Sequence, residues 1–321
     1  MKLEVAEVHA AYMLRAMAVP ALQTSRLTKD YGLGRGLFEL DLEVPTGQVF
    51  GFLGPNGAGK TTTIRCVMGM IRPTSGSAHV FGLDCVRDPV EVKRLVGYLP
   101  GEIPQFGGMH GKDVVAYFGG MRGGVDAGRV RHLCERFDLD LGRRFREYSN
   151  GNKQKLGIVL AFMHSPRLLI LDEPTAGLDP LNQQEFYRLV NEARDAGATV
   201  FLSSHVLSEV EHVCERVGIV RAGRLVRVAE LDELHSMRVH RVEVVFATGS
   251  EVPEAAVRQA PGVEDVAIDG QTLSCTVRGD FQPLLSALRG SEVTNLVSRE
   301  PSLEELFLSY YREGDALALR A

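Results

Sequence analysis

Short apolar runs from about residue 22 onward predict a domain in which strands alternate with helices. The segments at 48–53, 96–100, 168–171 and 199–205 are typical of buried strands. Apolar residues at helical spacing follow three of them, at Ile64, Val67, Met68 and Ile71, at Phe186, Leu189, Val190 and Ala193, and at Val206, Val210, Val213 and Val217. We expect a further strand region at 37–44 and a hairpin that turns at 221–224. The pattern indicates an α/β fold.

The pattern changes after residue 236. It reads as strand at 242–246, helix at 254–259, strands at 263–268 and 273–277, helix at 281–288 and strand at 293–297. The order β-α-β-β-α-β predicts a small α+β domain of ferredoxin-like type. A last helix carries Leu303, Leu306, Phe307 and Tyr310, and Ser302 with Glu305 has the spacing of a capping box. No catalytic constellation occurs in this part of the chain.

Composition is that of an ordinary globular protein. The 321 residues are 45% hydrophobic and 24% charged, and the net charge of −5 argues against a nucleic-acid partner. The sequence has no run of 18 apolar residues, so we expect no transmembrane helix. Glu4 and Glu7 interrupt the place where the apolar core of a signal peptide would lie. The five cysteines are scattered without a C-x-x-C pair, which favours reduced core residues of a cytoplasmic protein. Residues 1–21 form an N-terminal extension, either a short helix at 8–17 or a disordered leader.

The first candidate site follows the apolar run at 48–53. The residues Gly54-Pro55-Asn56-Gly57-Ala58-Gly59-Lys60-Thr61-Thr62 fit the phosphate-loop pattern G-x-x-x-x-G-K-[ST], and a helical pattern follows. Glycines let backbone N–H groups surround phosphate oxygens, and the start of the helix adds partial positive charge. We expect Lys60 to reach the β- and γ-phosphates of a nucleotide and the Thr61 hydroxyl to bind Mg²⁺.

The second candidate site follows the run at 168–171. Asp172 and Glu173 stand at the carboxyl end of this predicted strand, the end at which open α/β sheets bind ligands. We expect Asp172 to hold Mg²⁺ and Glu173 to polarise the attacking water. His205 ends the next predicted strand and is expected to reach the γ-phosphate.

Three further segments carry weaker signals. Ser149 and Gly151 precede a helical pattern at 152–161, so a second anion-binding helix start is possible, although such clusters are usually turns. Tyr31 is either a packing residue or a platform for a purine ring, and beside a phosphate loop we favour stacking. The arginines of the helical region at 111–137, which are Arg122, Arg129, Arg131 and Arg136, are expected on solvated faces.

With these motifs in order, residues 22–232 resemble the nucleotide-binding subunit of ATP-binding-cassette (ABC) transporters. The motifs are the phosphate loop, the signature Ser149-Asn150-Gly151-Asn152-Lys153-Gln154, the acid strand 168–173, the loop with Asp179 and the histidine His205. The resemblance implies a P-loop NTPase fold of ABC type at 22–236, with a helical subdomain at about 102–160. Residues 237–321 would form the accessory domain.

The family's roles carry over by position. Two subunits would face each other head to tail, with each ATP between one subunit's phosphate loop and the other's Ser149 and Gly151. Glu173 would be the general base, Lys60 and His205 would contact the γ-phosphate, and Tyr31 would carry the adenine. Asp179 belongs to the nucleotide-binding set, and Thr61 with Asp172 to the Mg²⁺ site.

Two departures from the family pattern stand out. The usual signature L-S-G-G-Q is changed at Tyr148, Asn150 and Asn152, while Ser149 and Gly151 are kept. In the loop 98–102, Gly101 stands where the family has a glutamine that contacts Mg²⁺ and the membrane subunit. Glu102 or Gln105 is the candidate substitute.

The signature and this loop look most like bacterial exporter ATPases. The resemblance implies a homodimer of nucleotide-binding domains on the cytoplasmic face of the membrane, driving a separate permease, whose cargo is not readable from this chain. The alternative is a soluble cassette ATPase acting on nucleic acid or the ribosome. Such proteins commonly carry two cassettes and basic extensions, whereas this chain has one cassette and is acidic. A phosphate-loop kinase or GTPase would not explain the segment 149–154 or His205.

Overall fold

The computed structural model describes residues 19–231 and 239–299, and the chain divides into two compact units between Glu230 and Leu231. The helices predicted at 8–17 and after Ser302 lie outside the described residues. Within these two ranges, no helix is long and apolar enough to cross a membrane.

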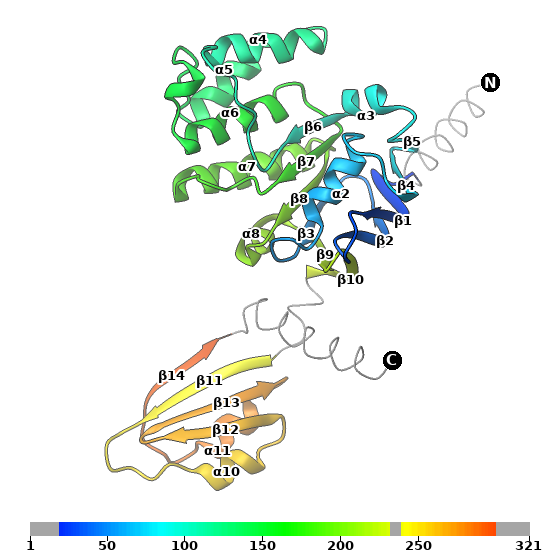
Figure 1. Ribbon diagram of the computed structural model, residues 1–321. Coiled ribbons are helices and arrows are strands. Elements are labelled where there is room, and N and C mark those ends of the chain that lie inside the picture. Colours follow the sequence, from blue (N-terminus) through cyan, green and yellow to red (C-terminus); the bar gives the residue numbers. More distant parts are fainter. Residues whose placement is uncertain (1–18, 232–238, 300–321) are drawn as a thin grey trace, which may run out of the picture. The chain divides into compact units, whose positions relative to one another are not determined.

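A six-stranded sheet forms the centre of the first unit (Figure 1). Its strand order is β10-β9-β3-β8-β7-β6, and all neighbours are parallel except the hairpin partners β9 and β10. Every residue of β3, β7 and β8 is buried, which explains their continuous apolar runs. The strands are β3 (Val49–Leu53), β6 (Val96–Leu99), β7 (Leu168–Asp172), β8 (Thr199–Ser204), β9 (Arg216–Arg221) and β10 (Arg224–Glu230).

A second, antiparallel sheet has the order β2-β1-β4-β5 and comprises β1 (Leu22–Asp30), β2 (Gly36–Val44), β4 (Ser75–Val80) and β5 (Leu83–Asp84). Helix α2 (Lys60–Val67) contacts strands of both sheets. Ile64 and Val67 of α2 belong to a core cluster that also contains Leu22 and Leu40 of the small sheet and Phe50 and Phe201 of the large one. The helix after the phosphate loop is therefore fixed between two sheets.

The remaining helices of this unit are α3 (Pro89–Leu95), α4 (Gly111–Met121), α5 (Ala127–Arg136), the 3-10 helix η1 (Phe145–Glu147), α6 (Asn150–Phe162), α7 (Pro180–Asp195) and α8 (Leu207–Val213). Helices α4, α5 and α6 gather on the side of this unit away from β1 and β2 (Figure 1). These three helices lie in the segment for which the sequence predicts a helical subdomain.

The expectation that the arginines of this region lie on solvated faces was wrong for Arg129 and Arg136, which are half-buried, whereas Arg122 and Arg131 are exposed. Arg136 bridges to Glu185 and Glu192 of α7, and its side chain is only 12% exposed. Arg122 donates to the backbone oxygens of Lys93 and Val96, and Arg129 donates to that of Phe162. These arginines hold α4 and α5 to neighbouring segments. A helical pattern with scattered arginines does not show which carbonyl groups will face them.

The second unit has the elements β11 (Val239–Phe246), α10 (Glu254–Gln259), β12 (Val263–Asp269), β13 (Thr272–Arg278), α11 (Gln282–Ala287) and β14 (Val293–Arg299). The predicted order of strands and helices is confirmed. Its antiparallel sheet has the order β12-β13-β11-β14 and a core of its own that includes Val244, Leu273 and Leu284. The five cysteines are free and buried, as expected.

Candidate functional site

The phosphate-loop segment joins the end of β3 to the start of α2. Gly57 and Gly59 have φ values of +82° and +107°, a left-handed backbone that glycine adopts at least cost. Gly59 is the N-cap of α2. A Cβ atom at Gly54 would lie 2.3 Å from the carbonyl oxygen of Val220, so this position also requires glycine. The predicted strand, glycine loop and helix are thus present in that order.

A cavity of about 510 Å³ opens over this loop. Its lining comprises residues 55–62 together with Tyr31, Gly34, Arg35, Gly36, Glu173 and Ala222. Tyr31 is 56% exposed, and the Lys29 ammonium lies 5.4 Å from the centre of its ring. The volume is in the range of small-molecule sites. The position of Tyr31 on the wall allows it to stack on a planar ligand group.

Lys60 is buried at the start of α2, with 6% of its side chain exposed. Its Nζ donates to the carbonyl oxygen of Gly54 at 2.6 Å and lies 3.2 Å from Oε1 of Glu173. A buried ammonium needs such partners, since an unpaired buried charge is costly. Lys60 is therefore held directly beside the glycine loop and the second acid of β7.

Asp172 is 1% exposed at the end of β7 and contacts two hydroxyl groups. Thr61 Oγ1 donates to its Oδ2 at 2.9 Å, and Ser203 Oγ donates to its Oδ1 at 2.5 Å. A carboxylate beside a hydroxyl is the hard oxygen donor set that suits Mg²⁺, which takes few protein ligands and completes its shell with water and phosphate oxygens. The residues present fit that ion. The part of the chain that the structure describes holds no cluster of three or more His, Cys, Asp or Glu side chains arranged as a metal site.

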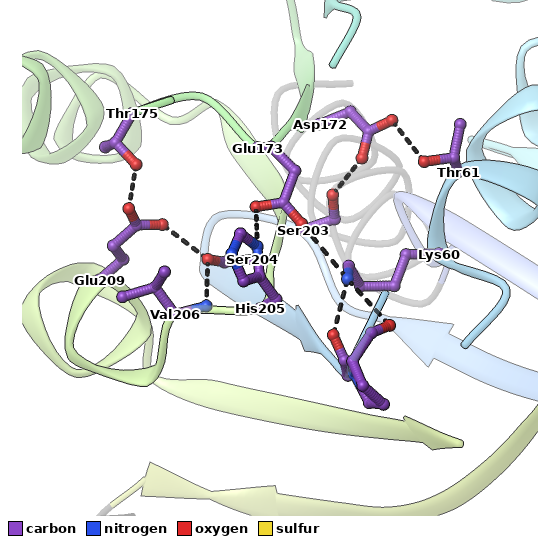
Figure 2. A network of polar contacts seen from close by, with 12 residues as sticks. Lys60, Thr61, Asp172, Glu173, Thr175, Ser203, Ser204, His205, Val206 and Glu209 are labelled. Atoms are coloured by element: carbon purple, nitrogen blue, oxygen red, sulfur yellow. Dashed lines mark hydrogen bonds and ion pairs between the residues drawn. The ribbon is translucent and has the colours of Figure 1, made fainter. Parts of the chain in front are cut away.

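Glu173 follows β7 with a φ of +50°, a left-handed conformation that is uncommon outside glycine. Its Oε2 lies 2.8 Å from Nδ1 of His205, so the carboxylate joins His205 to Lys60 (Figure 2). Strained backbone conformations of this kind cluster at functional sites. The structure thus brings together the three side chains that the sequence assigned to catalysis.

Ser149, Gly151 and Asp179 are not among the residues that line the cavity. Ser149 is the N-cap of α6, where its Oγ accepts from the backbone N–H of Asn152. A Cβ at Gly151 would lie 2.8 Å from the carbonyl oxygen of Gly177, so α6 approaches the loop before α7 closely. Asp179 is the N-cap of α7, and hydrogen bonds from Asn182 lower the pKa of its carboxyl. These residues form a second, separate group.

The loop with the unexpected glycine lies beside the first acid. A Cβ at Gly101 would be 3.3 Å from Oδ2 of Asp172, and Glu102 and Gln105 are both exposed. Gly101 therefore occupies a place next to the Asp172 carboxylate, and the structure favours neither candidate substitute.

Several contacts of the site were not predicted from the sequence. Ser203 was assigned only to a strand, yet it is a direct partner of Asp172. Gln154 Nε2 donates to the carbonyl oxygens of Glu173 and Pro174, at 3.3 and 2.8 Å. Gly34, Arg35 and Gly36 line the cavity as well. Two adjacent serines at the end of an otherwise apolar strand were a usable signal for Ser203.

The cavity, its glycine loop and the acids at the carboxyl end of β7 define a nucleotide-binding P-loop protein. Comparison with known proteins then specifies the family. Residues 37–176 match the family model described as ABC transporter. The daunorubicin resistance ATP-binding protein of Streptomyces coeruleorubidus is 34% identical over 304 residues, which cover 91% of this chain and 96% of the relative. The chain belongs to the ABC transporter family, as an ATP-binding, ATP-hydrolysing protein.

Two other relatives match over different lengths of this chain. The bacitracin transport ATP-binding protein of Bacillus licheniformis is 38% identical over 217 residues, 66% of this chain and 71% of the relative. The Nod factor export ATP-binding protein I of Cupriavidus pinatubonensis is 31% identical over 301 residues, 91% of this chain and 92% of the relative.

Solved structures agree with this fold. An ATP-binding subunit of an ABC transporter matches with a TM-score of 0.62 and 28% identity, covering 67% of this chain and 92% of that one. A dimeric ATP-binding cassette in a post-hydrolysis state, bound to ADP and Pi, matches with a TM-score of 0.59 and 20% identity, covering 65% of this chain and 98% of that one.

Proposed function

We propose that this chain powers an exporter, coupling ATP-driven dimerisation to transport through a separate membrane permease. The observation that carries the proposal is the contact of Glu173 with both Lys60 and His205 at the glycine-lined cavity. The relatives are named for transport, resistance and export, which favours this function over a soluble cassette with a nucleic-acid or ribosomal role.

ATP would occupy the cavity over residues 55–62. The backbone N–H groups of the loop and the start of α2 would receive the phosphates, and the Lys60 ammonium would neutralise part of their charge. Tyr31 would stack on the adenine. Thr61 and Asp172 would hold Mg²⁺, whose role is to neutralise phosphate charge during phosphoryl transfer.

Hydrolysis would use Glu173 as the base that orients and polarises the attacking water. A carboxylate in this position must be ionised and must face the terminal phosphate. His205 would contact the γ-phosphate and hold the Glu173 carboxylate through its Nδ1. The phosphates would compete with Glu173 for Lys60, which leaves the carboxylate available to the water.

A second copy of the chain would complete the site. Ser149 and Gly151 are separate from the cavity of their own chain, and Ser149 stands exposed at the N-terminus of α6, where backbone N–H groups can receive an anion. In a head-to-tail dimer these groups, together with Asp179, would meet the nucleotide bound by the partner.

The proposed function divides the chain into three parts. Residues 22–236 would be the ATPase domain with a helical subdomain at about 102–160, after the extension 1–21. Residues 237–321 would regulate the dimer or stabilise it. The chain would lie on the cytoplasmic face of the membrane, bound to its permease.

The dimer provides the test. With Glu173→Gln, which should keep ATP unhydrolysed, the full chain should shift from monomer to dimer with ATP and not with ADP, measured by size-exclusion chromatography with light scattering. Adding Ser149→Arg should abolish the shift while ATP still binds. An ATP-dependent dimer that survives Ser149→Arg would contradict the proposed contact.

A further inference from the structure

A second connection, distinct from the Glu173–His205 contact, joins the same two segments. Glu209 on α8 accepts a hydrogen bond from the Thr175 hydroxyl through Oε1 and one from Ser204 Oγ through Oε2, the latter at 2.6 Å. Figure 2 shows the Glu209 carboxylate between the two hydroxyl groups. Thr175 lies two residues after Glu173, and Ser204 lies directly before His205.

Both hydroxyl groups depend on this carboxylate. Thr175 is 2% exposed and Ser204 is 0% exposed, so water is a poor alternative partner. Ser204 Oγ also accepts from the backbone N–H of Val206 at 2.9 Å, which fixes the backbone on the far side of His205. Removing its acceptor leaves a buried hydroxyl unsatisfied, which is costly and favours a shift of its segment toward another acceptor.

The alternation of β8 separates two tasks. Successive residues of a strand point to opposite faces, so Ser203 and Ser204 diverge. Ser203 reaches Asp172, the proposed metal ligand, whereas Ser204 reaches Glu209 on α8. Glu209 is therefore linked to the His205 segment through a different side chain from the one that orients Asp172.

Two helices, α6 and α8, hold the loop after β7. Gln154 of α6 donates to the carbonyl oxygens of Glu173 and Pro174, while Glu209 of α8 accepts from Thr175. Both contacts border the left-handed backbone of Glu173. Glu209 itself does not line the nucleotide cavity.

We propose that Glu209 is a positioning residue for hydrolysis, which sets the separation of the segments carrying Glu173 and His205 by accepting from Thr175 and Ser204. This inference rests on the proposed function. Glu209 should affect the chemical step and not nucleotide binding. Its partners, Thr175 and Ser204, belong to the segments that carry the two catalytic side chains and not to the phosphate loop.

The expected effects follow from the hydrogen bonds. Glu209→Ala leaves both hydroxyl groups without their acceptor, and kcat should fall about tenfold, since small displacements of reacting groups are costly. KM for ATP should stay within about twofold. In Glu209→Gln, the amide keeps one acceptor oxygen and offers an N–H group to the other hydroxyl oxygen. We therefore expect kcat to stay within about threefold of the wild type.

The test measures steady-state phosphate release, ATP binding and thermal unfolding of the full chain. Ser208→Ala, at an exposed position next to Glu209 on α8, is the matched control and should behave as the wild type. Thr175→Val is nearly isosteric and removes one of the two hydroxyl donors. Thr175→Val added to Glu209→Ala should lower kcat no further than Glu209→Ala alone, because both changes break the same link.

Each outcome decides the inference. The inference would be overturned if Glu209→Ala left kcat unchanged, or if it lowered ATP affinity as much as kcat. It would also be overturned if the effects of Thr175→Val and Glu209→Ala on kcat multiplied independently. If Glu209→Ala does not fold, the failure of Thr175→Val to lower kcat would do the same. Absence of turnover in the wild type would instead contradict the proposed function.

Discussion

Glu173 Oε2 lies 2.8 Å from Nδ1 of His205, although 32 residues separate them in the chain. The contact follows from the pairing of the parallel strands β7 and β8, in which Asp172 is opposite Ser203. The residues that directly follow β7 and β8 leave the sheet at the same edge, the edge at which α/β folds bind ligands. The other carboxylate oxygen of Glu173 faces Lys60 at 3.2 Å, so the sheet register unites three sequence motifs.

Lys60→Ala should weaken MgATP binding by tenfold or more and abolish turnover. The ammonium group of Lys60 is buried beside the glycine loop, and its loss also removes the ion pair with Glu173. Nucleotide titration and phosphate release measure both effects, with Lys112→Ala, at an exposed position on α4, as the control. Unchanged turnover in Lys60→Ala would remove the phosphate loop from the mechanism.

Glu102→Ala tests the loop in which glycine replaces glutamine. If Glu102 is the substitute, the variant should lower hydrolysis in the complex with the permease several-fold and leave ATP affinity within about twofold. Gln105→Ala is the matched comparison, because both side chains are exposed in the same loop. An effect of Gln105→Ala alone would transfer the role to Gln105, and normal coupling in both variants would make Glu102 a solvated loop acid.

A chain truncated after Val239 should fold and bind ATP. The first unit has its own core around α2, and among the described residues the core of the second unit is built from residues after Val239. Calorimetric titration with ATP, after circular dichroism has shown a folded protein, gives the answer. A folded truncated chain that binds no nucleotide would show that the second unit is needed for the site.

His164 should make stability depend on pH. Burial, followed by the nearby charge of Arg122, lowers the pKa of this histidine from 6.5 to about 4. The unfolded chain therefore binds the proton more readily, so stability is full above pH 6.5 and declines as the pH falls toward 4. Since the side chain is partly exposed, we expect about half of the full effect, or about 1 kcal/mol between pH 7.5 and pH 5.

Urea unfolding at these two pH values measures this difference. His164→Gln, which keeps a donor for the carbonyl oxygen of Val96 but does not titrate, should lose less stability than the wild type. An equal loss in both proteins would assign the pH dependence to other groups.

Much of this architecture was predictable because local chemistry dictates it. Strands buried on both faces need runs of apolar residues, and the positive φ values at Gly57 and Gly59 favour glycine. The element order of the second unit was read correctly from alternation and helical spacing. Asp172, Glu173 and His205 could be placed at one edge because parallel strands share their carboxyl ends.

The parts that were missed depend on contacts between distant segments. Nothing in the local sequence of Arg136 indicates that α7 will present Glu185 and Glu192 to it. Ser203 and Glu209 acquire their partners only when β7, β8 and α8 are assembled. The proximity of Gly101 to the Asp172 carboxylate likewise arises from the fold.

The central claim is that Glu173 activates the water that cleaves ATP, and Glu173→Gln tests it most directly. Glutamine keeps the size of the side chain but is not a useful base, so phosphate release should fall by about a hundredfold or more. MgATP affinity, measured by titration of the same preparation, should stay within about threefold because the phosphate loop is unchanged. Hydrolysis by Glu173→Gln at a rate near that of the wild type would contradict this account.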